Sequence, residues 1–168
     1  MCAEITVSYI QDIDQKQSVF HTDLIPEHAG NGVANFVTLS KSGFYNGLKV
    51  FALVPFGWFQ SGCPFDVGTG NAGLFFDSEA EAQKDKPKAS HEIGALALVH
   101  SEKFGKCSSQ FFMTLASLPS FNGKYTVIGK VDEKEQIMLK DFNKFEVDEK
   151  TNEPKKSITI KSIQIVTK

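Results

Sequence analysis

The chain has 168 residues, enough for one domain with a sizeable hydrophobic core, and we treat residues 1–168 as a single domain. Hydrophobic residues make up 41%, charged residues 23%, and the formal net charge is −2. This balance is typical of a soluble globular protein and lacks the basic surface that nucleic-acid binding needs. Every basic residue is a lysine, because the sequence contains no arginine.

The three cysteines, Cys2, Cys63 and Cys107, are odd in number and widely spaced. This pattern argues against a disulfide framework or a zinc site, and we expect no metal ion or cofactor. The N-terminal residues carry neither a basic stretch nor a long apolar run, so we expect no signal peptide and no transmembrane helix. We expect a reducing, cytoplasmic location and a monomer.

The N-terminal part predicts a β-hairpin followed by a helix. Two short β-prone runs, residues 5–10 and 19–24, flank a polar turn. Apolar residues then recur at helical spacing across residues 33–39. Asn31 is the expected N-cap of this helix and Gly43 its expected end.

The middle of the chain predicts short strands and loops. Residues 48–64 are rich in apolar and aromatic side chains and lead into a glycine-rich loop at 67–71. No Gly-Lys-Ser or Gly-Lys-Thr follows those glycines, which favours a turn over a phosphate-binding loop. Residues 74–90 are polar and predict a surface loop with a turn of helix, and residues 91–98 predict a strand.

Residues 107–131 predict two strands joined by a polar loop. The run Gln110–Met113 contains two adjacent phenylalanines, and residues 125–131 are again β-prone. Between them, Asn122-Gly123 is a strong turn signal. Adjacent residues of a strand point to opposite faces, so one phenylalanine can fill a core while the other lines a pocket.

The C-terminal part predicts a second amphipathic helix across residues 132–142 and a final strand across 157–166. The alternation of the strand slips at Lys161-Ser162, which predicts a bulge. Many short strands, two helices and no alternating β-α pattern indicate a mainly β fold, an antiparallel barrel or sandwich capped by helices.

Two segments carry a resemblance to a known family. Ser-Gln-Phe-Phe at 109–112, followed by Asn-Gly-Lys-Tyr-Thr-Val-Ile-Gly-Lys-Val at 122–131, resembles the cyclophilin-type peptidyl-prolyl cis-trans isomerases. Residues 48–64 keep the register of a third family motif. The resemblance covers nearly the whole chain. It implies a closed eight-stranded antiparallel β-barrel capped by two α-helices, which binds Xaa-Pro segments of peptides or proteins.

The resemblance also identifies a missing catalytic group. Amide rotation has a barrier of ~18–20 kcal/mol, and cyclophilins lower it with an arginine aimed at the twisted amide. Ala52 occupies the position of that arginine. A flexible lysine cannot copy the planar guanidinium, and His100 is a possible substitute donor. Losing one aimed donor costs about 3–4 kcal/mol, so we expect weak or absent catalysis.

The residues implied to bind substrate match the family more closely than the catalytic position does. Gln60 matches the glutamine that contacts the substrate backbone, and the remaining implied binding residues are Phe56, Trp58, Val99, Phe112, Phe121 and Tyr125. Ser120 stands where cyclophilins have the tryptophan that binds cyclosporin, which implies poor cyclosporin affinity.

The residues alone leave simpler readings open. Phe112 and Phe121 could be plain core, Gln60 could be a structural hydrogen-bonding residue, and scattered histidines such as His91 favour surface or capping roles over ligation. Three functions remain: a weak or reorganised isomerase, a non-catalytic module that binds proline-containing or extended peptides, and an interaction protein with a filled pocket. The absence of arginine favours the second over the first.

Overall fold

The structure is a computed structural model that describes residues 1–11, 13–100 and 105–167. Its strands form one antiparallel sheet in the order β3-β4-β7-β6-β8-β2-β1-β9, with β5 beside β7. The strands are β1 (Cys2–Gln11), β2 (Asp14–Leu24), β3 (Ala52–Val54), β4 (Trp58–Ser61), β5 (Phe76–Asp77), β6 (Ala95–His100), β7 (Lys106–Thr114), β8 (Thr126–Val131) and β9 (Ile158–Val166). The mainly β, antiparallel class is as predicted.

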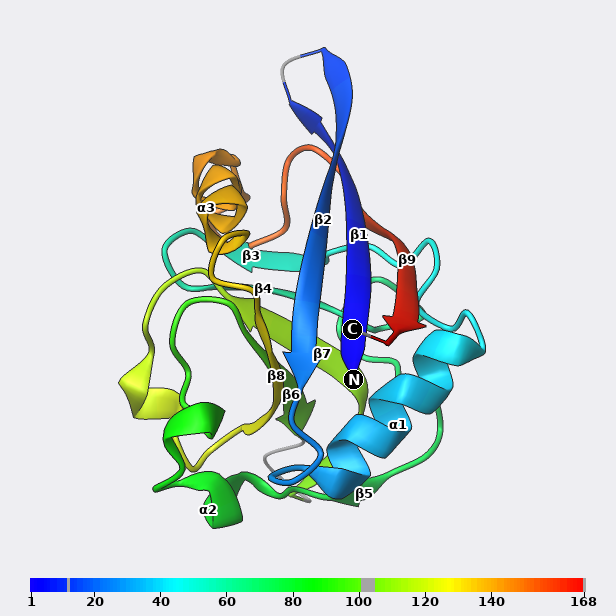
Figure 1. The fold of residues 1–168 in the computed structure, drawn as a ribbon. Coiled ribbons are helices and arrows are strands. Elements are labelled where there is room, and N and C mark those ends of the chain that lie inside the picture. Colours follow the sequence, from blue (N-terminus) through cyan, green and yellow to red (C-terminus); the bar gives the residue numbers. More distant parts are fainter. Residues whose placement is uncertain (12, 101–104, 168) are drawn as a thin grey trace.

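The sheet curls on itself but its two ends are not joined by a full strand pair (Figure 1). The segment before β3 meets β9 through an isolated bridge between Lys49 and Thr159 and a few backbone bonds, such as Val50 N–H to the Ile158 carbonyl at 2.9 Å. The predicted closed eight-stranded barrel is wrong in this respect. Gly47, at φ +83°, turns the chain just before this segment, so little extended backbone faces β9.

The helices are α1 (Gly30–Lys41), α2 (Ala80–Gln83) and α3 (Gln136–Leu139), with 3₁₀ turns at Pro87–Ala89, Pro119–Phe121 and Lys140–Lys144. The predicted second helix across 132–142 is therefore a single α-helical turn followed by a 3₁₀ turn. The buried Leu139 and Phe142 are three residues apart, which suits the tighter 3₁₀ repeat.

The N-terminus of α1 is held by a distant side chain. The backbone N–H groups of Asn31 and Gly32 donate to the Glu79 carboxylate, at 3.2 and 2.9 Å. The prediction of Asn31 as N-cap was wrong, because it lies inside the first turn. A carboxylate here also suits the positive end of the helix dipole. Gly43, at φ +75°, ends the helix as predicted.

The main core lies between α1 and the concave side of the sheet. Phe36 of α1, Tyr45 and Phe111 of β7 pack with ring centroids 5.3–5.8 Å apart. Near the opposite end, Phe59 and Phe142 stack at 5.1 Å. These rings thus fill the interior, each contributing a large buried apolar area.

The bulge predicted in the last strand is confirmed. Thr6 of β1 is opposite Ser162, whereas the next residue, Val7, is opposite Ile160. Lys161 is therefore the extra residue. Because the extra residue absorbs the slip in alternation, apolar side chains on both sides of it can face the core.

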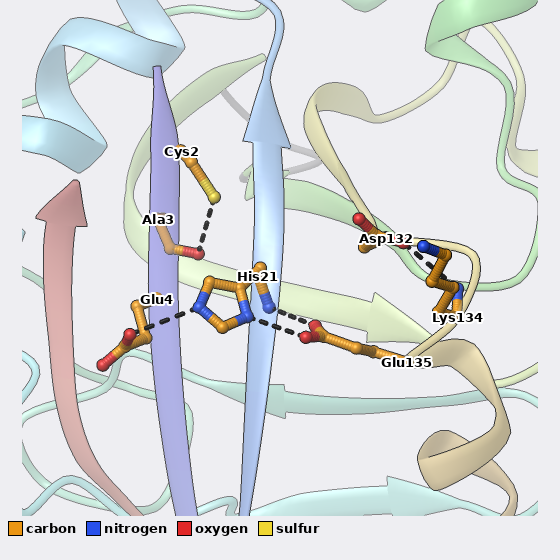
Figure 2. Close-up of polar contacts among 7 residues, drawn as sticks. All are labelled: Cys2, Ala3, Glu4, His21, Asp132, Lys134 and Glu135. Carbon is orange, nitrogen blue, oxygen red and sulfur yellow. Dashed lines mark hydrogen bonds and ion pairs between the residues drawn. The ribbon is translucent and has the colours of Figure 1, made fainter. Parts of the chain in front are cut away.

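One histidine ties the turn before α3 to the N-terminal hairpin (Figure 2). His21 on β2 contacts Glu135 through Nδ1 at 2.7 Å and Glu4 of β1 through Nε2 at 3.3 Å. Its backbone N–H also donates to Glu135. The Glu135 hydrogen bond raises the pKa of His21, burial opposes this, and the charges of Glu135 and Glu4 add to the rise.

We expect the free energy of unfolding to fall as the pH rises through the folded-state pKa of His21. A histidine whose pKa is raised by folding stabilises the fold when protonated, so the contribution is complete below 6.5 and is lost above the raised value. Urea unfolding across this range should give a steeper pH dependence for the native chain than for Glu135→Gln. Glu133→Gln removes the same charge from an exposed neighbour and should keep the native slope. Equal slopes in all three proteins would contradict the assignment.

Candidate functional site

A second apolar cluster lies on the outer face of the sheet, separate from the main core. Its buried members are Ile25, Ala89, Ala95, Ala97, Phe112 and Val127, and its partly buried border is Trp58, Val99, Phe121 and Tyr125. The two phenylalanines of β7 divide as the strand period predicts, because Phe111 belongs to the main core and Phe112 to this outer cluster.

Strand register brings the predicted site residues into one row. Ala52 of β3 is opposite Gln60 of β4, Gln60 is opposite Phe112 of β7, and Phe112 is opposite Ala97 of β6. Residues directly opposite each other in a ladder present their side chains to the same face. Ala52, Gln60 and Phe112 are therefore neighbours on the outer face, with no intervening strand between successive members.

Aromatic rings surround Phe112. Its ring centroid lies 5.9 Å from that of Phe121 and 5.2 Å from that of Tyr125, both edge-on. Trp58 packs on Phe121 at 5.5 Å. Phe112 is only 3% exposed, whereas Trp58, Phe121 and Tyr125 are partly exposed. The accessible apolar surface of this site is thus provided by the border rings.

The loop that carries Phe121 and Tyr125 is fixed to the sheet by a buried histidine. The Asn122 Oδ1 accepts the backbone N–H of His91 at 2.9 Å and lies 3.0 Å from His91 Nδ1. The imidazole also stacks on Phe112 at 5.9 Å. Burial lowers the pKa of His91, although the bond to Asn122 opposes this. The surface or capping role predicted for His91 was wrong, since its side chain supports the aromatic cluster from within.

Gln60 is held by a second glutamine that the sequence reasoning missed. Gln110 of β7 donates through Nε2 to the carbonyls of Gly68 and Gly70, at 2.8 and 2.7 Å. Its Oε1 therefore faces Gln60 and accepts from Gln60 Nε2 at 3.0 Å. Carbonyl oxygens only accept, so the two glycines fix which way both amides are turned. The feature of the sequence that could have identified Gln110 is its position directly before Phe111-Phe112.

His100 lies apart from Ala52. It ends β6, and strands β7 and β4 lie between β6 and β3 in the sheet. Its ring packs on Tyr125 at 5.1 Å, and it borders two cavities of about 350 and 400 Å³. Val99 and Gln110 line the larger cavity. Strands are spaced about 4.8 Å apart, so His100 lies beyond the row at Ala52, and its role as a substitute donor stays a prediction.

Phe56 does not join the site. It occupies the turn between β3 and β4 at φ 58°, is 73% exposed, and its backbone N–H donates to Asn143 Oδ1 at 2.7 Å. Of the two implied binding residues Phe56 and Trp58, only Trp58 packs on the aromatic cluster. Ser120 is exposed in the 3₁₀ turn next to Phe121.

The family model described as cyclophilin type peptidyl-prolyl cis-trans isomerase/CLD matches residues 10–165. The chain belongs to the cyclophilin family. It is 40% identical over 109 residues to peptidyl-prolyl cis-trans isomerase B of Bacillus subtilis, covering 65% of this chain and 73% of that relative. It is 34% identical over 119 residues to a peptidyl-prolyl cis-trans isomerase of Helicobacter pylori, covering 71% and 70%.

A solved structure resembles this cyclophilin over its full length. The crystal structure of a Cryptosporidium parvum cyclophilin type peptidyl-prolyl cis-trans isomerase, determined in the presence of the dipeptide Ala-Pro, superposes with a TM-score of 0.80 at 25% identity. The match covers 100% of both chains.

Two further properties follow from the described part of the chain. None of its helices is both long and apolar enough to span a membrane. Nor do the described residues bring three or more His, Cys, Asp or Glu side chains together so that they could hold a metal ion.

We expect Asn122→Ala to lower the free energy of unfolding by about 1–3 kcal/mol, because it leaves two buried groups of His91 without their acceptor. Chemical denaturation would measure the change, and the emission of Trp58 would report loosening of the Phe121 loop. Lys124→Ala, at an exposed position of the same loop, is the control and should unfold like the native protein. If Asn122→Ala loses no more free energy of unfolding than Lys124→Ala does, the role given to Asn122 is contradicted.

Proposed function

We propose that this cyclophilin binds Xaa-Pro segments of other proteins on its outer aromatic face and catalyses their isomerisation weakly at most. The observation that carries the proposal is the row formed by Ala52, Gln60 and Phe112 across β3, β4 and β7. It combines an oriented backbone-binding group and an aromatic surface with a methyl group where the family arginine stands.

Gln60 supplies the polar contact. One N–H of its amide is used by Gln110, so its Oε1 remains available to accept a peptide N–H, and the rest of its amide can donate to a peptide carbonyl. The Gln60 amide is already held in one orientation before a peptide binds, so binding costs it little further rotational freedom.

The border rings supply the proline contact. Proline has no N–H to satisfy and presents an apolar ring, which suits a surface of partly exposed aromatic side chains. Trp58, Phe121 and Tyr125 provide this surface, and Tyr125 adds a hydroxyl at its edge. The Ala-Pro dipeptide present with the Cryptosporidium relative supports a ligand of this kind. Ser120 in place of tryptophan supports poor cyclosporin affinity.

Catalysis needs a hydrogen-bond donor whose interaction with the substrate strengthens as the amide twists. No side chain of the row formed by Ala52, Gln60 and Phe112 provides one. Ala52 has no polar group, and the Lys106 ammonium forms an ion pair with Asp77 at 2.9 Å. Gln60 can bind the planar and twisted amides about equally, and such uniform binding does not lower the barrier between them. The three cysteines are buried and are not joined in disulfides, which suits the reducing setting of the cytoplasm.

A second candidate function is an interaction protein whose proline pocket is filled by its own side chains. The specific observation in its favour is the 3% exposure of Phe112, which Trp58 and Phe121 together shield. Under this candidate the aromatic face is a closed hydrophobic cluster and takes no peptide.

The single tryptophan separates the two candidates, since Trp58 lies in the site and its emission reports there alone. We expect titration with an Ala-Pro tetrapeptide to give a saturable change in emission, and the same peptide with alanine in place of proline to give a much smaller one. Gln60→Ala should lower the affinity for the proline peptide by about tenfold, as expected when a lost hydrogen bond leaves a buried partner unpaired. No saturable change with the native protein would favour the filled-pocket candidate.

We expect Ala52→Arg to increase the isomerisation rate of an Ala-Pro peptide by about 10²–10³-fold over the native protein, because it restores the aimed donor. A protease-coupled assay would measure this. Ala52→Lys is the matched control, since it adds the same charge without the planar fork and should recover far less. If the native chain already isomerises as fast as Ala52→Arg, catalysis does not depend on this position.

A further inference from the structure

Cys63 follows β4 and is fully buried, yet its sulfur is surrounded by backbone donors. The N–H of Gly70 donates to Cys63 Sγ at 3.1 Å. The backbone N–H groups of Val67, Phe65 and Gly68 interact with the same sulfur. One N–H group thus bonds the sulfur directly, and three more from the same loop favour its charged form, which resembles an anion-binding backbone nest.

The sulfur is well suited to this role as a thiolate. Burial by itself raises the pKa of the Cys63 thiol, but the N–H groups of Gly70, Val67, Phe65 and Gly68 outweigh it, and the net effect is a lowered pKa. Cys107 is the contrast within this chain, because burial raises its pKa to about 11. The two sulfurs differ in their desolvation as well as in the backbone donors beside Cys63, and the charge of Glu79 adds to the rise at Cys107.

A continuous chain of hydrogen bonds leads from this sulfur to the peptide-binding glutamine. Gly70 donates its N–H to Cys63, and its carbonyl accepts from Gln110. Gln110 in turn accepts from Gln60 through its own Oε1. The Gly68 carbonyl provides a parallel link to Gln110. The sulfur is thus three hydrogen bonds away from the Gln60 amide.

The outer part of the glycine-rich loop makes few packing contacts of its own. Phe65 and Val67 are 70% and 66% exposed, so little packing fixes the outer part of the loop. Ser109 of β7 bonds the Gly62 carbonyl before the loop and the Ala72 N–H after it, at 2.8 and 3.0 Å. Between these ties the loop is held by three side chains: Cys63 at Gly70, Gln110 at Gly68 and Gly70, and Asp66 at Lys49.

We infer that Cys63 is a positioning residue, which holds the glycine-rich loop through its backbone N–H groups and thereby sets the orientation of Gln110 and Gln60. The loop also lines the cavity of about 400 Å³ beside Gln110 through Gly68 and Thr69. Cys63 therefore controls the shape of the site on two sides without touching a bound peptide. The inference deepens the proposed peptide-binding function and rests on it for its effect on affinity.

The sign of the pH effect follows from the charge. A thiolate accepts N–H groups more strongly than a thiol, so the loop and Gln60 are best ordered when Cys63 is deprotonated. This order is lost as the pH falls through the lowered pKa of Cys63. On the loop, the charged neighbour is Asp66, whose carboxylate accepts the backbone N–H of Lys49 at 2.8 Å. From β7, Ser109 and Gln110 contact the loop and do not titrate. The titratable His100 of β6 and Lys106 of β7 line the cavity that the loop borders.

The first test needs no peptide. Side-chain amide signals of Gln60 and Gln110 and the backbone signal of Gly70 would be followed by NMR as the pH is lowered. We expect all three to shift with one midpoint in the native chain and in Asp66→Asn, and to lose this transition in Cys63→Asp, which keeps a charged acceptor. Cys63→Ala should displace the same signals at every pH. If the Gly70 signal titrates while those of Gln60 and Gln110 stay fixed, or if Cys63→Ala leaves Gln60 unmoved, the positioning role is wrong.

The second test measures affinity through Trp58 emission with the proline tetrapeptide. We expect binding to weaken about tenfold in Cys63→Ala and to recover in Cys63→Asp. Unlike these two variants, the native protein should lose affinity as the pH falls through the lowered pKa of Cys63. Cys107→Ala removes a thiol remote from the nest and should keep the native pH profile. A native protein that binds no peptide would overturn the proposed function while the NMR result still decides the role of Cys63. Equal affinity of native and Cys63→Ala proteins across the pH range would overturn the inference itself.

Discussion

The structure depends on the two-residue period of β7. This strand pairs with β4, β6 and the short β5, so it lies at the centre of the contacts that define both faces of the sheet. Phe111 fills the interior against Phe36 and Tyr45, and Phe112 supports the outer aromatic cluster. A slip of one residue would exchange the two rings and destroy the core and the site together. The stability of the fold and the geometry of the site are therefore set by the same register, which leaves little freedom to change one without the other.

The loops and the start of α1 are held by polar contacts between residues that lie far apart in the sequence. Asn122 holds the Phe121 loop to His91, Glu79 holds the start of α1, and Gln110 holds the glycine-rich loop. Each contact satisfies backbone groups that a loop or a helix end would otherwise leave unpaired. Such contacts stabilise the native state modestly when made but are costly when one partner is removed. This asymmetry explains how a few polar side chains can fix the loops around an otherwise apolar surface.

The sequence predicted what local periodicity and motif spacing determine. The hairpin, α1, the bulge at Lys161 and the opposite orientations of Phe111 and Phe112 all follow from the alternation of residues along the chain. The failures were non-local. Glu79 caps a helix whose N-terminus lies 47 residues earlier, so no local pattern could identify it. His91 looked like a surface residue because burial depends on the loop that folds over it. The strand order places β7 and β4 between His100 and Ala52, a separation that sequence alone does not show.

The replacement of the family arginine by Ala52 that we propose would separate two functions that one site usually combines. Binding an Xaa-Pro segment needs an oriented backbone partner and an apolar surface, and both exert their effect equally on planar and twisted amides. Rate enhancement needs a group whose interaction grows as the amide nitrogen regains its lone pair. Gln60 and the border rings belong to the first class, and their positions do not depend on any side chain at position 52, because Gln60 is fixed from β7 and the glycine-rich loop. Under the proposed function, loss of the donor removes differential stabilisation of the twisted amide while the binding geometry persists, which is the physical basis for expecting a cyclophilin that holds its target peptide without isomerising it.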